Sequence, residues 1–202
     1  SSGLVTSVAD GTATITVTSG SANGTSAVTV AVPASLELSD TLLTFSALGD
    51  TTQLTATVKN AAGSTISGAT VSWATSDDAV ATVSSAGLVT SVANGSATVT
   101  ATSGEVSDTV AVTVLQTAVS VELSDTLLTF PSLGDGTTLT ATVKDAGGTA
   151  IPGVTVTWAT SDSTVATVSD GGRVTAVTNG TATITATSGS ASATAAVTVA
   201  QA

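Results

Sequence analysis

The chain repeats itself at an interval of 85 residues. The segment Val71–Asp77 returns as Val156–Asp162 with a single substitution, and Phe45 returns as Phe130 at the same spacing. Solenoid repeats are shorter, about 20 to 50 residues, so a period this long indicates whole domains arranged in series. Proteins of this kind usually work through the arrangement of their domains.

The 202 residues hold two complete repeats, preceded by a remainder at the N-terminal side. The remainder matches the second half of a repeat, because Gly3–Val8 has the same sequence as Gly87–Val92. We therefore predict a partial domain at residues 1–35 that holds C-terminal strands only, and complete domains at 36–117 and 118–202.

A half-domain of this kind would expose strand edges and an apolar face to water, which is unfavourable. Two interpretations follow. In the first, the chain is part of a longer repeat protein. In the second, a neighbouring chain supplies the missing strands and completes the partial domain.

The composition restricts what the chain can bind. Hydrophobic residues make up 42% of the sequence, but there are only two Phe and two Trp, so each core must be built mainly from Val, Leu, Ile and Ala. Charged residues make up 8%, against about 25% in a typical domain. The net charge of −11, with three basic residues, argues against nucleic acid and against anionic membrane surfaces. We expect no direct membrane insertion, because no apolar run is long enough to span a bilayer.

Short runs in each repeat alternate between apolar and hydroxyl residues, which is typical of half-buried strands. Leu54, Ala56 and Val58 would face a core while the threonines between them face solvent. Turn residues separate about seven such runs in each repeat, and the Asn-Gly pairs at Asn94 and Asn179 predict tight hairpins. The fold class predicted is all-β, a tandem of immunoglobulin-like antiparallel β-sandwiches.

The single Trp of each repeat, Trp73 or Trp158, lies on an inward-facing position of its run. We expect it to fill the space between the two sheets. Both aromatic rings would then be withdrawn from the surface, where sugar binding by stacking would need them.

Several strings of the first complete repeat resemble the bacterial immunoglobulin-like group 2 family. They are Leu54–Val58, Trp73–Asp77, Val80–Val83, Gly87–Val89 and Gly95–Ala101. In the second complete repeat, Lys144–Gly148 and Ile151–Val156 are also similar to the group 1 domains of intimin and invasin adhesins. The resemblance covers nearly the whole chain and implies a module that occurs in series on bacterial surface proteins, phage particles and secreted enzymes. It implies a setting and not an activity.

We expect no catalytic, cofactor-binding or metal site. The sequence contains no His, Cys or Tyr, so the usual Ser-His and Cys-His nucleophile pairs cannot form. A structural calcium ion is the alternative, because acidic residues recur near the predicted joins and in loops. The candidate ligands are Glu37, Asp40, Asp77, Glu122, Asp125 and Asp162. No dense acidic loop with fixed ligand spacing supports that alternative.

The function expected is that of non-catalytic spacer modules, extracellular or at the cell surface, in a larger bacterial protein such as an adhesin stalk. Its partners would be other domains of the same polypeptide. The alternative is a self-assembling subunit of a filament, surface lattice or virion, with homo-polymer contacts made by strand donation at the incomplete first domain. Carbohydrate-binding accessory modules are a third alternative.

Overall fold

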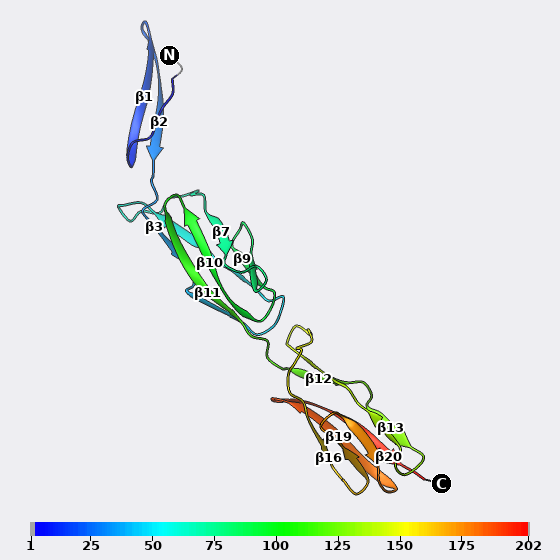
Figure 1. Cartoon of the computed structure of the whole chain (residues 1–202). Coiled ribbons are helices and arrows are strands. Elements are labelled where there is room, and N and C mark those ends of the chain that lie inside the picture. The colour runs from blue at the N-terminus through cyan, green and yellow to red at the C-terminus, as the bar shows by residue number, and fades with distance from the viewer. Residues whose placement is uncertain (1–2, 202) are drawn as a thin grey trace. The chain divides into compact units, whose positions relative to one another are not determined.

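The computed structural model describes residues 3–201, so the predicted outer boundaries at residues 1 and 202 lie outside the described part. Those residues form strands and no helix, and none of them forms a helix that could span a bilayer. By their contacts the chain divides into two compact units (Figure 1). Unit 1 ends at Thr113 and lacks Phe45–Asp50, and unit 2 contains Phe45–Asp50 together with the chain from Val114 onward.

The first two strands form a separate antiparallel hairpin, hereafter the N-terminal hairpin. They are β1 (Gly11–Ser19) and β2 (Ala22–Val30). All nine residues of β1 pair with β2, from Gly11 opposite Val30 to Ser19 opposite Ala22. The partners are threonines and small apolar residues, which favour extended backbone. No further strand pairs with this hairpin in the described part of the chain.

Nine strands build the first complete domain. They are β3 (Ser35–Leu38), β4 (Leu42–Phe45), β5 (Thr51–Gln53), β6 (Ala56–Lys59), β7 (Ser72–Thr75), β8 (Ala81–Val83), β9 (Leu88–Ser91), β10 (Gly95–Ser103) and β11 (Val106–Val114). One layer is the four-stranded sheet β4-β11-β10-β7, and β3-β6 and β5-β9-β8 supply the opposing strands.

The second complete domain repeats this arrangement with nine strands. They are β12 (Ser120–Leu123), β13 (Leu127–Phe130), β14 (Gly136–Thr138), β15 (Ala141–Lys144), β16 (Thr157–Thr160), β17 (Ala166–Val168), β18 (Arg173–Ala176), β19 (Gly180–Ser188) and β20 (Ala191–Val199). Its sheets are β13-β20-β19-β16, β12-β15 and β14-β18-β17. The described residues form strands and no helix, which confirms the predicted all-β fold class.

Two details differ from the sequence prediction. There are nine strands in each complete domain where about seven were expected, because short runs of three or four residues pair separately in two small sheets. In addition, β13 runs parallel to β20, from Leu127 opposite Ala196 to Phe130 opposite Val199. Alternation of side chains is the same in parallel and antiparallel strands, so the sequence pattern does not distinguish them.

Aliphatic side chains fill both cores, as the composition predicts. The largest fully buried ones are Leu54, Val89, Val99, Val110, Val112 and Val114 in the first domain and Leu139, Val174, Ile184 and Val197 in the second. Trp73 is partly buried and packs against a cluster of Leu36, Val58 and Ala101, and Trp158 is partly buried and packs against the cluster that contains Leu139 and Ile184. The indole rings therefore contribute to the cores, although each keeps some contact with solvent.

The prediction of tight hairpins at the Asn-Gly pairs is wrong. Gly95 is the first residue of β10, and β9 and β10 belong to different sheets, so the chain crosses between layers just before Gly95. Gly95 has φ of +152°, and a Cβ added to it would come within 2.8 Å of Val80 Cγ2. Glycine is therefore needed at position 95 for close packing. The tight turns of the long hairpins lie elsewhere, at Gly104 between β10 and β11 and at Gly189 between β19 and β20.

Candidate functional site

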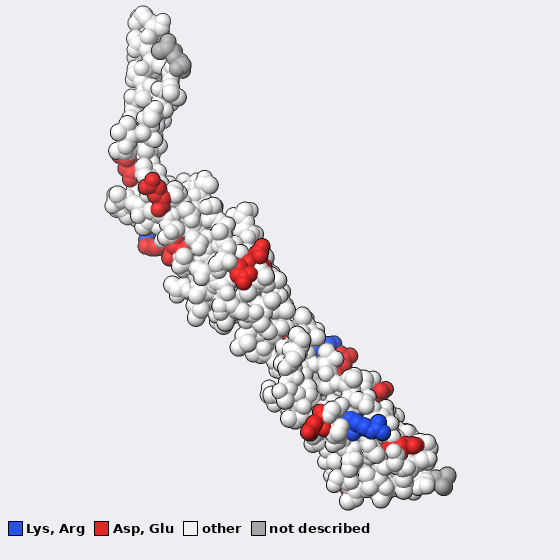
Figure 2. Space-filling model, viewed as in Figure 1, with Lys and Arg blue, Asp and Glu red and all other residues white. Residues whose placement is uncertain are grey.

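Charged side chains are sparse on the surface, and in Figure 2 they form small separate patches. Glu37 on β3 accepts a hydrogen bond from Lys59 on β6, with the two atoms 2.7 Å apart. Glu122 and Lys144 form the same pair in the second domain, and the lysine lowers the pKa of Glu122 by hydrogen bonding and by its charge. Two of the candidate calcium ligands are therefore engaged in cross-strand ion pairs.

Asp77 and Asp162 act as turn residues after β7 and β16. The Oδ1 atom of Asp77 accepts a hydrogen bond from the amide of Ala79 at 3.0 Å. Asp162 Oδ1 accepts bonds from the hydroxyl and the amide of Thr164, and these bonds lower its pKa. Asp78 is adjacent to Asp77, but the matching position in the second domain is Ser163, so the pair is not a repeated feature.

The predicted ligands are not brought together. Asp40 accepts a hydrogen bond from its neighbour Ser39 at 2.9 Å, and Asp125 follows β12 at the equivalent place. Among residues 3–201 no group of three acidic, His or Cys side chains could hold a metal ion. The acidic residues at these positions support turns and strand pairs.

Asp145, which the sequence analysis did not single out, is a buried charged residue of unit 2. It is only 2% exposed. Its Oδ1 accepts the amide of Thr149 at 2.8 Å, and its Oδ2 accepts the amide of Leu48 at 3.0 Å and the side-chain amide of Gln116 at 2.8 Å. The carboxylate thus joins three separate segments of unit 2.

These hydrogen bonds explain the ionisation of Asp145. The Gln116 side chain and the surrounding backbone amides hold the pKa of the Asp145 carboxyl below its ordinary value, against the opposing effect of burial. The equivalent residue in the first domain is Asn60, whose Oδ1 accepts the amides of Ala62 and Ser64. The local turn needs one oxygen, and the second carboxylate oxygen of Asp145 serves the additional contacts.

We expect Asp145→Asn to destabilise unit 2 at neutral pH, because the new NH₂ group would face the donors of Leu48 and Gln116. Since the pKa is lowered by folding, the carboxylate stabilises the unit above the unfolded pKa of about 3.9, and this contribution is lost as the pH falls through the folded pKa. Urea unfolding between pH 3 and 7 should therefore show a weaker pH dependence in the variant. Asp170→Asn, at an exposed position, is the matched control, and equal pH dependence in both variants would contradict this role.

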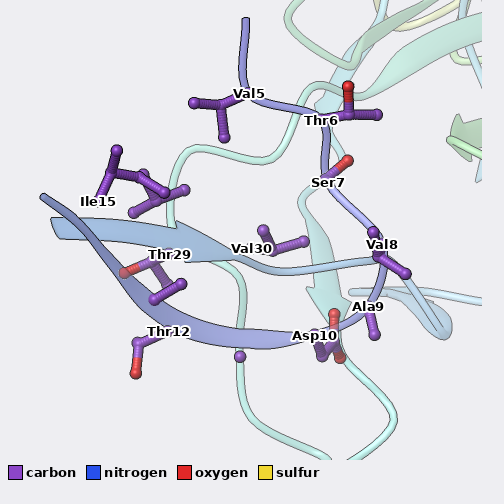
Figure 3. Close-up of a pocket in the computed structure, with 13 residues that line it drawn as sticks. Val5, Thr6, Ser7, Val8, Ala9, Asp10, Thr12, Ile15, Thr29 and Val30 are labelled. Atoms are coloured by element: carbon purple, nitrogen blue, oxygen red, sulfur yellow. The ribbon is translucent and has the colours of Figure 1, made fainter. Parts of the chain in front are cut away.

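The N-terminal hairpin borders an open groove of about 680 Å³. Figure 3 shows Val5, Ile15 and Val30 around it, between the segment that leads into β1 and the two strands. Asp10 lines the groove and accepts a hydrogen bond from the amide of Val32. The remaining lining is mostly apolar and hydroxyl-bearing, so it favours packing against another protein surface over acid-base chemistry.

The sequence profile of the bacterial Ig-like domain (group 2) matches the chain twice, over residues 34–114 and 118–199. These two matches span β3–β11 and β12–β20 and account for most of the 202 residues. No curated protein sequence matches the chain.

Several solved structures have a similar fold. Domains 1-6 of the surface layer protein SbsC are 24% identical with a TM-score of 0.42, and the match covers 90% of this chain and 30% of that one. SbsC domains 4 and 5 are 24% identical with a TM-score of 0.40, with 82% and 97% covered. The Escherichia coli adhesin FdeC is 18% identical with a TM-score of 0.45, with 94% and 74% covered. The chain thus spans about a third of the length of the longer surface-layer structures, and the likeness concerns the fold alone.

Proposed function

Because the chain belongs to the bacterial Ig-like domain (group 2) family, we propose that its domains are non-catalytic spacer modules of a larger bacterial cell-surface protein. The setting proposed is the extracellular stalk of an adhesin. The observation that carries the proposal is the tandem match, which coincides with two complete nine-stranded domains. The acidic residues are engaged in ion pairs and turns, which also favours a structural role.

The short connection between β11 and β12 supports the proposal. Five residues, Leu115–Val119, separate the two strands. The amides of Leu115 and Thr117 donate hydrogen bonds to the carbonyl oxygens of Phe45 and Ser46, at 2.9 and 3.0 Å. These bonds lie within unit 2. A connection of five residues has little slack by its length alone, and a spacer needs this property to carry a distant part of the protein.

Varying the number of repeats tests the spacer role. Chains with one to four copies of residues 118–202 would be displayed on cells with an epitope at the far end, and the height of the epitope above the membrane would be measured by super-resolution microscopy. We expect the height to grow in proportion to the number of copies, by about 30 to 40 Å for each. A Gly/Ser linker of equal residue count, whose span grows as about the square root of its length, is the control. Growth like that of the linker would contradict the proposal.

We further propose that the domains work without a resident metal or cofactor. Melting temperatures measured in millimolar calcium and in chelator should agree within error, because the candidate acids are dispersed among turns and ion pairs. A rise in melting temperature with calcium, following the mass-action dependence expected of a bound ligand, would refute this.

A second candidate function is self-assembly into a lattice, filament or virion surface. The observation that favours it is the N-terminal hairpin, whose apolar face and strand edges have no partner in the described chain. If strands from another copy completed it, the chain would polymerise. Light scattering across a range of concentrations separates the candidates, because a spacer stays monomeric and a strand-donating subunit grows with concentration.

A further inference from the structure

We infer that β13 and β20 of the second complete domain form a force-bearing pair, hereafter the clamp. A load drawn along the chain is resisted there by two strands that must slide past each other. The source of the load is the proposed spacer function, on which this inference rests, because a stalk whose far end is held is pulled along its length.

The direction of the two strands decides how they meet a load. β13 runs parallel to β20, with Leu127 opposite Ala196 and Phe130 opposite Val199 (Figure 1). The chain enters β13 at Leu127 and leaves β20 at Val199, so entry and exit lie at opposite ends of the pair. A pull on both acts along the strands and loads all their hydrogen bonds together. In an antiparallel pair, entry and exit would share one end, and the same pull would open the bonds in succession.

The hydrogen bonds of the clamp extend to both ends of the paired stretch. The amide of Ala196 donates to the carbonyl oxygen of Thr126 at 2.9 Å, and the amide of Ala200 donates to that of Phe130 at 3.0 Å. The evenly spaced bonds of a parallel ladder lie between these two. Sliding therefore has to break the whole set almost at once, whereas peeling breaks one bond at a time.

The inner face of the clamp is packed into the core. Leu128 and Phe130 of β13 and Val197 and Val199 of β20 are all buried and belong to one hydrophobic cluster. Sliding β13 along β20 would draw these side chains out of their packing while the hydrogen bonds break. The resistance thus includes lost apolar burial as well as lost hydrogen bonds.

The first complete domain repeats the bonds at the two ends of the clamp. The amide of Ala111 donates to the carbonyl oxygen of Thr41 at 3.1 Å, and the amide of Leu115 donates to that of Phe45 at 2.9 Å. The residue numbers on β4 and β11 rise together from one bond to the other, so these two strands also run parallel. Both complete domains therefore meet a pull along the chain with strands in shear.

The N-terminal hairpin meets the same pull with a different geometry. β1 and β2 are antiparallel, and Gly11, where the chain enters β1, lies opposite Val30, where it leaves β2. A pull along the chain acts across the strands at this one end and opens their pairs in succession. We expect the hairpin to open at a lower force than either complete domain.

Two pulling directions through the second complete domain test the clamp. The chain contains no cysteine, so two introduced cysteines fix where the DNA handles of an optical trap attach to the 202-residue protein. Asp125→Cys with Gln201→Cys places the handles ahead of β13 and behind β20, which loads the clamp in shear and leaves β12 out of the load path. Leu133→Cys with Gln201→Cys places both handles at the same end of the clamp, which peels it. All three positions are exposed.

We expect the rupture force in shear to be about threefold higher than in peeling, or more, because several bonds of the ladder share the load. The folded domain is the same in both measurements, so the difference reports geometry and not stability. Equal rupture forces in the two directions would overturn the inference.

Proline variants locate the resistance in the bonds of the clamp. Proline has no amide hydrogen, and Ala196 is exposed, so Ala196→Pro removes the bond to Thr126 without truncating a core side chain. We expect the shear force to fall by about a fifth to a third, the share of one bond in the ladder. The peeling force should not change, because peeling begins at the other end of the clamp. Ala200→Pro, which removes the bond to Phe130 at that end, should lower both forces.

Thr194→Pro is the matched control. Thr194 is exposed and lies on the same edge of β20, two residues ahead of the stretch that pairs with β13. Both rupture forces should stay at the values of the unsubstituted chain, and a loss of shear force as large as that of Ala196→Pro would overturn the inference. Such failures leave the spacer role untouched, because that role is tested by the height of displayed repeats. Heights that grow like those of the flexible linker would refute the spacer role and leave the two rupture forces as predicted.

Discussion

Replacing Leu139 with alanine is expected to lower the free energy of unfolding of unit 2 by about 2 to 5 kcal/mol. Leu139 is 1% exposed and belongs to the cluster that contains Phe130 and Ile184. Truncation removes buried methyl groups and leaves a cavity in a core that holds few large side chains to refill it. The effect should be confined to unit 2.

Urea unfolding followed by the emission of Trp158, in a Trp73→Phe background, measures this change. Leu133→Ala is the control, because Leu133 is 45% exposed and its truncation should cost less than about 0.5 kcal/mol. Leu54→Ala, the equivalent change in unit 1, should leave the Trp158 signal unaltered. A shift of both transitions by Leu139→Ala would contradict the independence of the two cores.

Replacing Gly172 with alanine is the second large change expected. The new Cβ would lie against the Leu139 carbonyl oxygen and 2.9 Å from the Trp158 ring, at a residue whose φ is +77°. An L-residue in this backbone conformation costs about 1 to 2 kcal/mol, and overpacking adds about 1 to 3 kcal/mol. We expect unit 2 to lose about 2 to 5 kcal/mol in total.

Gly189→Ala separates the two contributions. Gly189 has φ of +59°, but nothing lies within 4 Å of its missing Cβ. Only the backbone cost of about 1 to 2 kcal/mol should therefore appear, measured by the same Trp158 unfolding assay. Equal losses in the two variants would show that the close approach to Trp158 contributes nothing.

The repeat and the alternation of side chains were sufficient to predict the fold class. The run from Leu54 to Val58 shows why, because burial of every second residue is a local property that follows directly from strand geometry. Trp73 was also placed correctly against the core, although it keeps some exposure. Local patterns thus report which face of a strand is buried.

Relations between distant segments could not be predicted in this way. Gly95 looks like a hairpin residue in the sequence, and only the packing of Val80 against it reveals a crossing between sheets. Asp145 was overlooked because its partners Leu48 and Gln116 are 97 and 29 residues away. The one available signal was its replacement of Asn60 in an otherwise similar turn. The parallel pairing of β13 with β20 gave no local signal at all.

Single-molecule stretching of the 202-residue chain shows whether two self-contained domains follow one another along the chain and unfold separately. We predict two separate unfolding events under force, each lengthening the chain by about 250 Å, the extended span of roughly 80 residues less the folded domain. A single event that releases both domains together, or a smooth extension without events, would contradict it.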